Sequence, residues 1–236
     1  MLAQGIASVD LTPSRERLES MQPMGERFVG EIPRGPLWDR LLYAYFFERV
    51  FVEIALKRII AWPDLSAAEE PKVSGEPWPG PATEQDPPKN GSGPRIDVGR
   101  IAGRIAGLPH RVIAYRGADS FPVVVPVELA GHEQEGLRLV VPEGLLPPGG
   151  RRAGMLAHAF RPQLVGLSTL TLTGWLEVHS DGALVYAPHT SKGFVAPPRK
   201  KLLLVSNGLF ARYGIWKARQ RGTAQRLERL AEESST

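Results

Sequence analysis

Two neighbouring arginines, Arg151 and Arg152, follow a Pro-Pro-Gly-Gly segment at positions 147–150. Guanidinium groups bind a phosphate dianion through charge-assisted and often bidentate hydrogen bonds, and glycines allow backbone N–H groups to approach it. This segment is therefore the first candidate for a phosphate site. The alternative is a solvated turn that carries two exposed arginines.

A second group of polar side chains runs from His189 through Thr190, Ser191 and Lys192 to Gly193. An imidazole, two hydroxyls and an ammonium at adjacent positions could bind a phosphate or polarise a carbonyl of a bound ring. The alternative is a polar exit from a hairpin.

Threonines alternate with leucines in the segment 168–178, STLTLTGWLEV, and such alternation predicts a β-strand. The face opposite the leucines carries Thr169, Thr171, Thr173 and Trp175. These hydroxyls could hydrogen-bond the edge of a flat heteroaromatic ring, and Trp175 could stack on it. The alternative is an ordinary half-buried strand. Gly174 interrupts the row, which predicts a bulge or a close backbone approach.

The residue types exclude several other chemistries. The chain has no cysteine, so it has no disulfide framework, thiolate metal site, iron–sulfur cluster or cysteine nucleophile. Its histidines show neither an HExxH motif nor a close pair along the sequence, so we predict no metal site. His158 lies in an apolar segment and is interpreted as a structural histidine, with ligation of a haem iron as the alternative. The motifs GxSxG, P-loop and GxGxxG are absent.

The chain carries 29 basic and 25 acidic residues, a net charge of +4 that permits an acidic partner without requiring one. From Arg199 to Arg226 there are eight basic residues and no acidic one. A solvated basic helix explains this run, and contact with nucleic acid, an anionic membrane face or a cofactor phosphate is the alternative. No nucleic-acid-binding motif accompanies it, so nucleic acid is not an expected partner.

The most apolar stretch, residues 41–62, contains five charged side chains, so no membrane span is predicted. The first ten residues lack the basic and apolar regions of a signal peptide. We therefore expect a cytoplasmic protein.

Eight prolines and four glycines between residues 63 and 94 predict a linker or long surface loop without helix or strand. We expect Trp78 to pack this segment against a neighbouring surface. The expected organisation is an N-terminal segment (1–62), this linker (63–95), a barrel domain with a C-terminal helix (96–222) and a flexible tail (223–236). In the N-terminal segment we expect a helix over 36–47 and a strand from Val50. A single helix over 37–61 is the alternative.

In the C-terminal part, the sequence pattern predicts a helix that begins after Asp97, followed by short strands and a terminal helix. The expected strands cover 111–116, 121–129, 137–141, 151–160, 168–178, 183–187 and 201–206, and Asn207 is expected to cap a helix over 208–221. Pro122 and Pro126 both fall on even positions, which suits an edge strand. This pattern predicts an α+β protein, mostly β with flanking helices, built on a small antiparallel barrel.

Five segments between about 99 and 195 carry a family resemblance. They are LPH (108–110), RVIAYRGADSFPVVVPVELAG (111–131), LRLVVP (137–142), RRAGMLAHAF (151–160) and TGWLEV (173–178). In type and order they resemble the pyridoxamine 5'-phosphate oxidase-like, FMN-binding split-barrel superfamily. Residues 36–62 resemble part of a second barrel of the same kind.

The resemblance implies a homodimeric flavoprotein with FMN between the subunits, or F420 or haem in its place, and an oxidoreductase acting on a small molecule. It implies that Arg151 and Arg152 hold the cofactor phosphate, that Thr173 and Trp175 approach the ring, and that Lys192, with His189 nearby, balances its charge. The Ser-x-Lys pair by which the oxidases clamp the phosphate is absent between 137 and 165. That absence favours a second hypothesis, a non-enzymatic binding module whose basic C-terminal helix engages an acidic partner.

Overall fold

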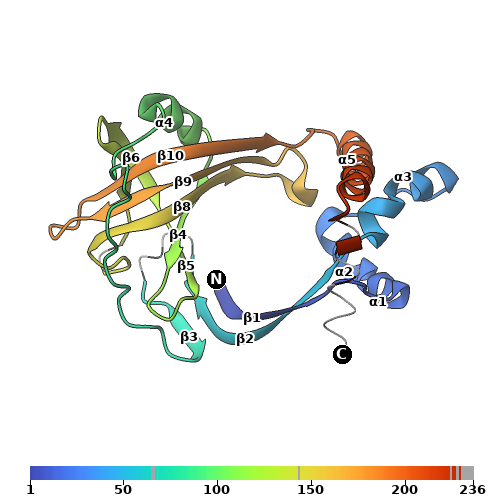
Figure 1. Ribbon diagram of the computed structural model, residues 1–236, viewed down its shortest axis with the longest axis horizontal. Helices are drawn as coiled ribbons and strands as arrows, with labels where there is room; N and C mark the ends of the chain where they lie inside the picture. The colour runs from blue at the N-terminus through green and yellow to red at the C-terminus, as the bar shows by residue number, and fades with distance from the viewer. Residues whose placement is uncertain (65–66, 68, 143, 224, 227–228, 230–236) are drawn as a thin grey trace. The chain divides into compact units, whose positions relative to one another are not determined.

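A seven-stranded antiparallel sheet, curled into a half-barrel, forms the larger part of the molecule (Figure 1). The computed structural model describes residues 1–64, 67, 69–142, 144–223, 225–226 and 229. Contacts divide the chain into two units. The barrel unit comprises residues 1–6, 56–159 and 168–195, and the helical unit comprises 7–55, 160–167 and the described residues from 196 on. The expected fold class, α+β with a small antiparallel barrel, is confirmed.

The seven strands lie in the order β5-β4-β8-β9-β10-β7-β6, and every neighbouring pair is antiparallel. Their bounds are β4 (His110–Arg116), β5 (Pro122–Pro126), β6 (Glu128–Glu133), β7 (Gly136–Val140), β8 (Gly149–Ala159), β9 (Ser168–Val178) and β10 (Leu184–Val195). The prediction of one strand over 121–129 is wrong, because β5 and β6 lie at opposite edges of the sheet. The chain turns at Val127, after Pro126, which has no N–H for a ladder bond, and Val127 N–H donates to Arg111 O (3.0 Å).

Alternate residues of β4, β5, β7, β8 and β9, and the first residues of β10, fill the interior of the half-barrel. β9 has its predicted bounds, with Leu170, Leu172 and Leu176 buried and Thr171 and Thr173 exposed. Helix α4 (Val98–Ala106) begins as expected, because the carboxylate of Asp97 accepts a hydrogen bond from Arg100 N (2.8 Å). Ile101 and Ile105 of this helix are buried in the same core.

Gly174 marks a close backbone approach, as predicted. A Cβ at this position would overlap the carbonyl oxygen of Ala187 on β10, and the β9–β10 register shifts between Pro188 and Thr190. Strand β10 continues through this irregularity to Val195. The expected strand over 183–187 is therefore too short, and the interpretation of 189–193 as a hairpin exit is wrong.

The three-stranded sheet has the order β1-β2-β3, with β1 (Leu2–Asp10), β2 (Phe51–Ala61) and β3 (Lys72–Gly75). Helix α3 (Pro36–Phe47) followed by β2 confirms the helix-then-strand prediction. The prediction of a linker without strands is wrong over 72–75, because these residues pair with 58–61 of β2. Trp78 packs against the barrel core, as expected.

The helical unit contains α1 (Arg15–Ser20), α2 (Gln22–Val29), α3, the short helix η1 (Pro162–Leu164) and α5 (Lys200–Gln220). Leu204 of α5 packs with Ile32 and Leu42 in a small core. The predicted strand over 201–206 is wrong, and Asn207 lies inside α5 instead of capping it. Three consecutive leucines fit either structure, and the packing of Leu204 and Gly208 against α3 favours the helix.

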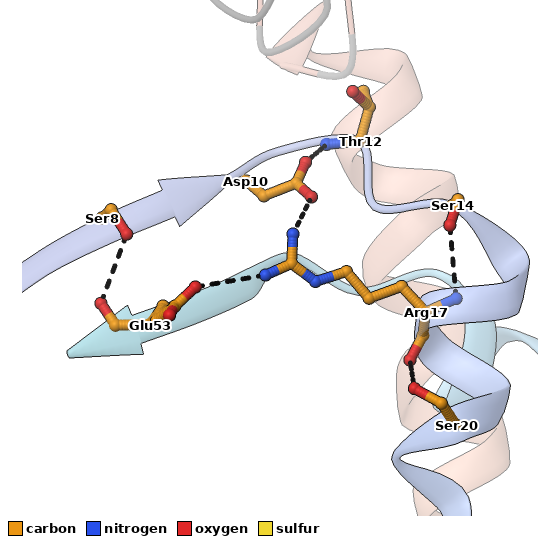
Figure 2. A network of polar contacts seen from close by, with 7 residues as sticks. All are labelled: Ser8, Asp10, Thr12, Ser14, Arg17, Ser20 and Glu53. Atoms are coloured by element: carbon orange, nitrogen blue, oxygen red, sulfur yellow. Dashed lines mark hydrogen bonds and ion pairs between the residues drawn. The ribbon is translucent and has the colours of Figure 1, made fainter. Parts of the chain in front are cut away.

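Arg17 ties the start of the helical unit together (Figure 2). Its guanidinium donates to Asp10 Oδ2 (3.2 Å) and Glu53 Oε2 (3.3 Å), and it lies over the ring of Phe51 at 3.9 Å. The hydroxyl of Ser14 accepts from Arg17 N (3.2 Å) and so caps α1. Neither β1, α1 nor α2 was expected from the sequence.

The predicted tail, residues 223–236, lies outside the described residues except for positions 223, 225, 226 and 229. Within the described part of the chain, no helix combines the length and apolar character needed to cross a membrane.

Candidate functional site

Three rows of side chains cross β8, β9 and β10 on the face turned away from the core. Their registers are Arg152–Trp175–Ala187, Gly154–Thr173–Thr190 and Leu156–Thr171–Lys192. Directly opposed residues of antiparallel strands point to the same face. Five of the six predicted cofactor residues, all but Arg151, therefore belong to this side or lie beside it.

Arg151 lies on the inner face of β8 and is only 1% exposed. Its Nη2 donates to the carbonyl oxygens of Pro147 (2.8 Å), Pro148 and Gly149 (3.2 Å), and its guanidinium lies 5.4 Å from the centre of the Tyr115 ring. Burial lowers the pKa of Arg151 and raises that of Tyr115. Arg151 and Arg152 thus point to opposite faces, so the structure does not bring their guanidinium groups together around one anion.

Residues 76–97, here called the strap, run from β3 to α4 across the strands of the barrel (Figure 1). At one end Gln85 N–H donates to Gly150 O (2.8 Å), and the side chain of Gln85 accepts from Arg152 N (3.1 Å). At the other end Arg95 N–H donates to Pro188 O on β10 (2.9 Å). The strap therefore passes β9, which lies between these two strands.

Trp175 lies in the row between the two attachments of the strap and is 3% exposed. Its indole Nε1 donates to Glu177 Oε2 (2.9 Å). A ring bound on this face could reach Trp175 only after the strap moved. His189, half-buried beside the strap, lies with Nε2 3.3 Å from Ser92 O.

The accessible part of the rows is here called the threonine face. It consists of Thr171, Thr173, Thr190, Lys192, Gly154 and Leu156. The hydroxyls of Thr173 and Thr190 are hydrogen-bonded to each other (2.6 Å), and both residues are exposed. Gly154, at the β8 end of its row, leaves that side of the face without a side chain.

The next row brings together two histidines that are 48 positions apart in the sequence. His110 of β4 and His158 of β8 are register partners with ring centres 5.2 Å apart. Burial and the neighbouring His110 lower the pKa of His158. The sequence predicts no close pair of histidines, and none occurs along the chain. In the folded chain, however, the β4–β8 register brings His110 and His158 side by side. No group of three or more potential metal ligands occurs among the described residues.

Two of the pockets of the barrel unit bear on the candidate site, the first beside the threonine face and the second beside the strap. One, of about 420 Å³, lies at an end of the β9–β10 hairpin and is lined by Arg104, Thr169 and Phe194 among others. The other, of about 370 Å³, lies between the strap and the loop before β8, and its walls include Trp78, Tyr115 and Pro147. Neither pocket is lined by a predicted cofactor residue.

Comparison with protein-family models, with curated proteins and with solved structures finds no match to this chain.

Proposed function

We propose that the threonine face binds FMN and that the chain is a homodimeric flavoprotein of the split-barrel type. The observation that carries the proposal is the gathering of exposed threonine hydroxyls and Lys192 on β9 and β10, beside Gly154 of β8, which has no side chain. A flat ring with polar edges needs an open floor and hydrogen-bond donors at its rim. Gly154 supplies the floor, and Thr173 and Thr190 supply the donors.

Charge on the same face suits the phosphate of the cofactor. Arg152 and Lys192 are exposed, and they lie four residues and two strand spacings apart, or roughly 16 Å. FMN carries a dianionic phosphate and a polar ring at opposite ends of a flexible chain. Arg152 would bind the phosphate and Lys192 would balance charge on the ring. Arg151, buried and engaged with carbonyl groups, would support the loop before β8.

The threonine face is open in a single chain, whereas bound cofactors usually bury most of their surface. A second copy that covers the face would enclose the ligand, which is why the proposal includes a homodimer. FMN supplies hydride-transfer chemistry where it binds. The residues of the threonine face would bind and orient it for a small-molecule substrate.

FMN uptake tests the proposal. The purified chain is incubated with FMN or with riboflavin, and bound flavin is read from its visible absorbance after gel filtration. We expect FMN to bind more tightly than riboflavin, which lacks the phosphate. Lys192→Gln should weaken FMN binding about ten-fold, because it removes a charged contact. Lys89→Gln, on the strap, is the matched control.

Gly154→Leu provides a steric test of the same face. A Cβ at Gly154 would lie 3.6 Å from Leu172 O, an ordinary contact, so the fold should tolerate a side chain there. The added leucine would occupy the floor of the site, and FMN uptake should be lost. A chain that takes up neither FMN nor F420, or a Gly154→Leu variant that binds FMN normally, contradicts the proposal.

A second candidate is a binding module that holds no cofactor. It is favoured by the positions of Arg151 inside the barrel and of Trp175 beside the strap, because two of the predicted cofactor contacts are then withdrawn from the open face. A colourless protein that dimerises without flavin would support this candidate.

A further inference from the structure

Helix α5 has two apolar faces on opposite sides, and only one of them is packed. Leu204 and Gly208 are buried, and a Cβ at Gly208 would lie 2.7 Å from the carbonyl oxygen of Leu41 on α3. The contact with α3 accounts for that face. Among the described residues of the helical unit, none packs over the opposite side of the helix, whose large apolar residues are exposed.

The opposite side carries large apolar residues that are more than half exposed. They are Leu202 (53%), Leu209 (56%), Phe210 (66%), Tyr213 (56%) and Trp216 (54%). Spacings of seven, four and three residues place Leu202, Leu209, Tyr213 and Trp216 in one stripe along the helix. The stripe spans about 21 Å at the rise of an α-helix. Tyr213 and Trp216 lie against each other with ring centres 5.7 Å apart.

Basic residues border this stripe on both sides. At about 100° per residue, Lys201, Arg212 and Arg219 fall along one flank. Lys217 and Arg221 fall along the other, and Lys217 Nζ lies 5.8 Å from the centre of the Tyr213 ring. No acidic residue occurs between Arg199 and Arg226 to neutralise them.

We propose that the exposed face of α5 binds the surface of an anionic phospholipid membrane, with the helix lying in the plane of the headgroups. An apolar stripe of leucine and aromatic side chains between two rows of cations suits this boundary, because the stripe enters the acyl region while the cations meet lipid phosphates. The proposal is independent of the cofactor.

Two other occupants fit the surface less well. Nucleic acid would satisfy the cations, but its phosphates offer little apolar surface to Leu202 and Leu209. A second copy related by a two-fold axis through this face would bring five cations towards five others, without an acidic residue on either helix. An anionic lipid surface satisfies both the charge and the apolar area.

Vesicle sedimentation of the full chain tests the proposal. Vesicles of phosphatidylcholine alone are compared with vesicles that also contain phosphatidylglycerol, at low and at high salt. We expect binding only to the anionic vesicles, and release at high salt. The double variant Arg212→Gln/Lys217→Gln should bind about 25-fold more weakly, or about five-fold for each cation. Arg27→Gln/Arg40→Gln, on exposed positions of α2 and α3, is the matched control and should bind normally.

A second variant separates the apolar contribution from charge. Leu209→Ser/Trp216→Ser alters two exposed residues, so the fold should persist, and vesicle binding should be lost even at low salt. Equal binding to neutral vesicles, or no binding to anionic ones, overturns the proposal. A further contradictory result is a wild-type chain that dimerises in the absence of lipid and becomes monomeric in this variant. That result would assign the face to a second copy. Binding to duplex DNA that needs Arg212 and Lys217 but not Trp216 would assign it to nucleic acid.

Discussion

Arg58 and Asp119, 61 residues apart in the sequence, form an ion pair between β2 and the turn that joins β4 to β5. The side chain of Arg58 is 2% exposed, and its Nη1 also donates to Pro77 O (2.6 Å). The pair therefore joins the three-stranded sheet, the strap and the half-barrel within the barrel unit. Such a buried cation depends on its partner, because an unpaired charge away from water is costly.

Asp119→Ala should lower the free energy of unfolding by about 3 kcal/mol, since it leaves the Arg58 guanidinium buried and unpaired. Arg58→Met/Asp119→Ala removes the stranded charge and should recover part of this loss. Urea denaturation of Arg58→Met, Asp119→Ala and the double variant gives the coupling free energy between the two side chains. Strictly additive effects would contradict a direct interaction.

Gly208→Ala and Gly214→Ala should change stability in opposite directions, although both lie in α5. Alanine favours a helix over glycine by about 1 kcal/mol, and nothing lies within 4 Å of a Cβ at Gly214, so that variant should be more stable. At Gly208 the added methyl meets the backbone of α3, so the variant should be less stable by about 1–3 kcal/mol. Thermal unfolding of the two variants checks the signs. A stabilising Gly208→Ala would contradict the close α3–α5 contact.

Gly174→Ala should destabilise the barrel unit by about 1–3 kcal/mol, because the methyl group would overlap the Ala187 carbonyl oxygen on β10. Gly131→Ala is the control, since a Cβ there meets nothing within 4 Å. Chemical denaturation compares the two. Equal effects would show that the loss comes from the strand backbone in general and not from this contact.

The free energy of unfolding should fall below neutral pH because His158 becomes protonated. Its pKa in the folded chain is lowered by burial and by the neighbouring His110, so the unfolded chain binds more protons as the pH falls through about 6.5. The stabilisation is complete above that value and is lost below it. Urea midpoints at about pH 7.5 and about pH 5.5 should differ less in His158→Gln than in the wild type. His132→Gln, at an exposed position, should keep the full difference. A His158→Gln variant with unchanged pH dependence would contradict this assignment.

The elements predicted best from the sequence are those in which one local signal dominates. The alternation of Thr and Leu correctly predicted β9, and Asp97 correctly predicted where α4 begins. The strand expected over 201–206 failed because consecutive leucines carry no period, and tertiary packing of Leu204 decides for the helix. The expected strand over 183–187 was too short, because β10 continues past a register shift between Pro188 and Thr190, and no local pattern in the sequence specifies such a shift.

The candidate site was predictable only in part, for the same reason. The alternation in β9 correctly placed Thr173 and Trp175 on one face, but no local pattern places the strap beside Trp175. The expected strand over 151–160 already contained Arg151 and Arg152, and adjacent residues of a strand point to opposite faces, so the sequence alone could have shown that they do not share one anion. Proximity of His110 and His158 depends on the pairing of β4 with β8, which a single sequence does not specify.

The single residue Val127 joins the two edge strands of a seven-stranded sheet. The end of β5 and the start of β6 therefore lie within about 8 Å of each other, so the sheet has bent until its margins meet at this corner. Pro122 and Pro126 on one margin, and the register irregularity between Leu129 and Gly131 on the other, further hinder the addition of a foreign strand. By the same reasoning, amyloid-like polymerisation through the main sheet is disfavoured.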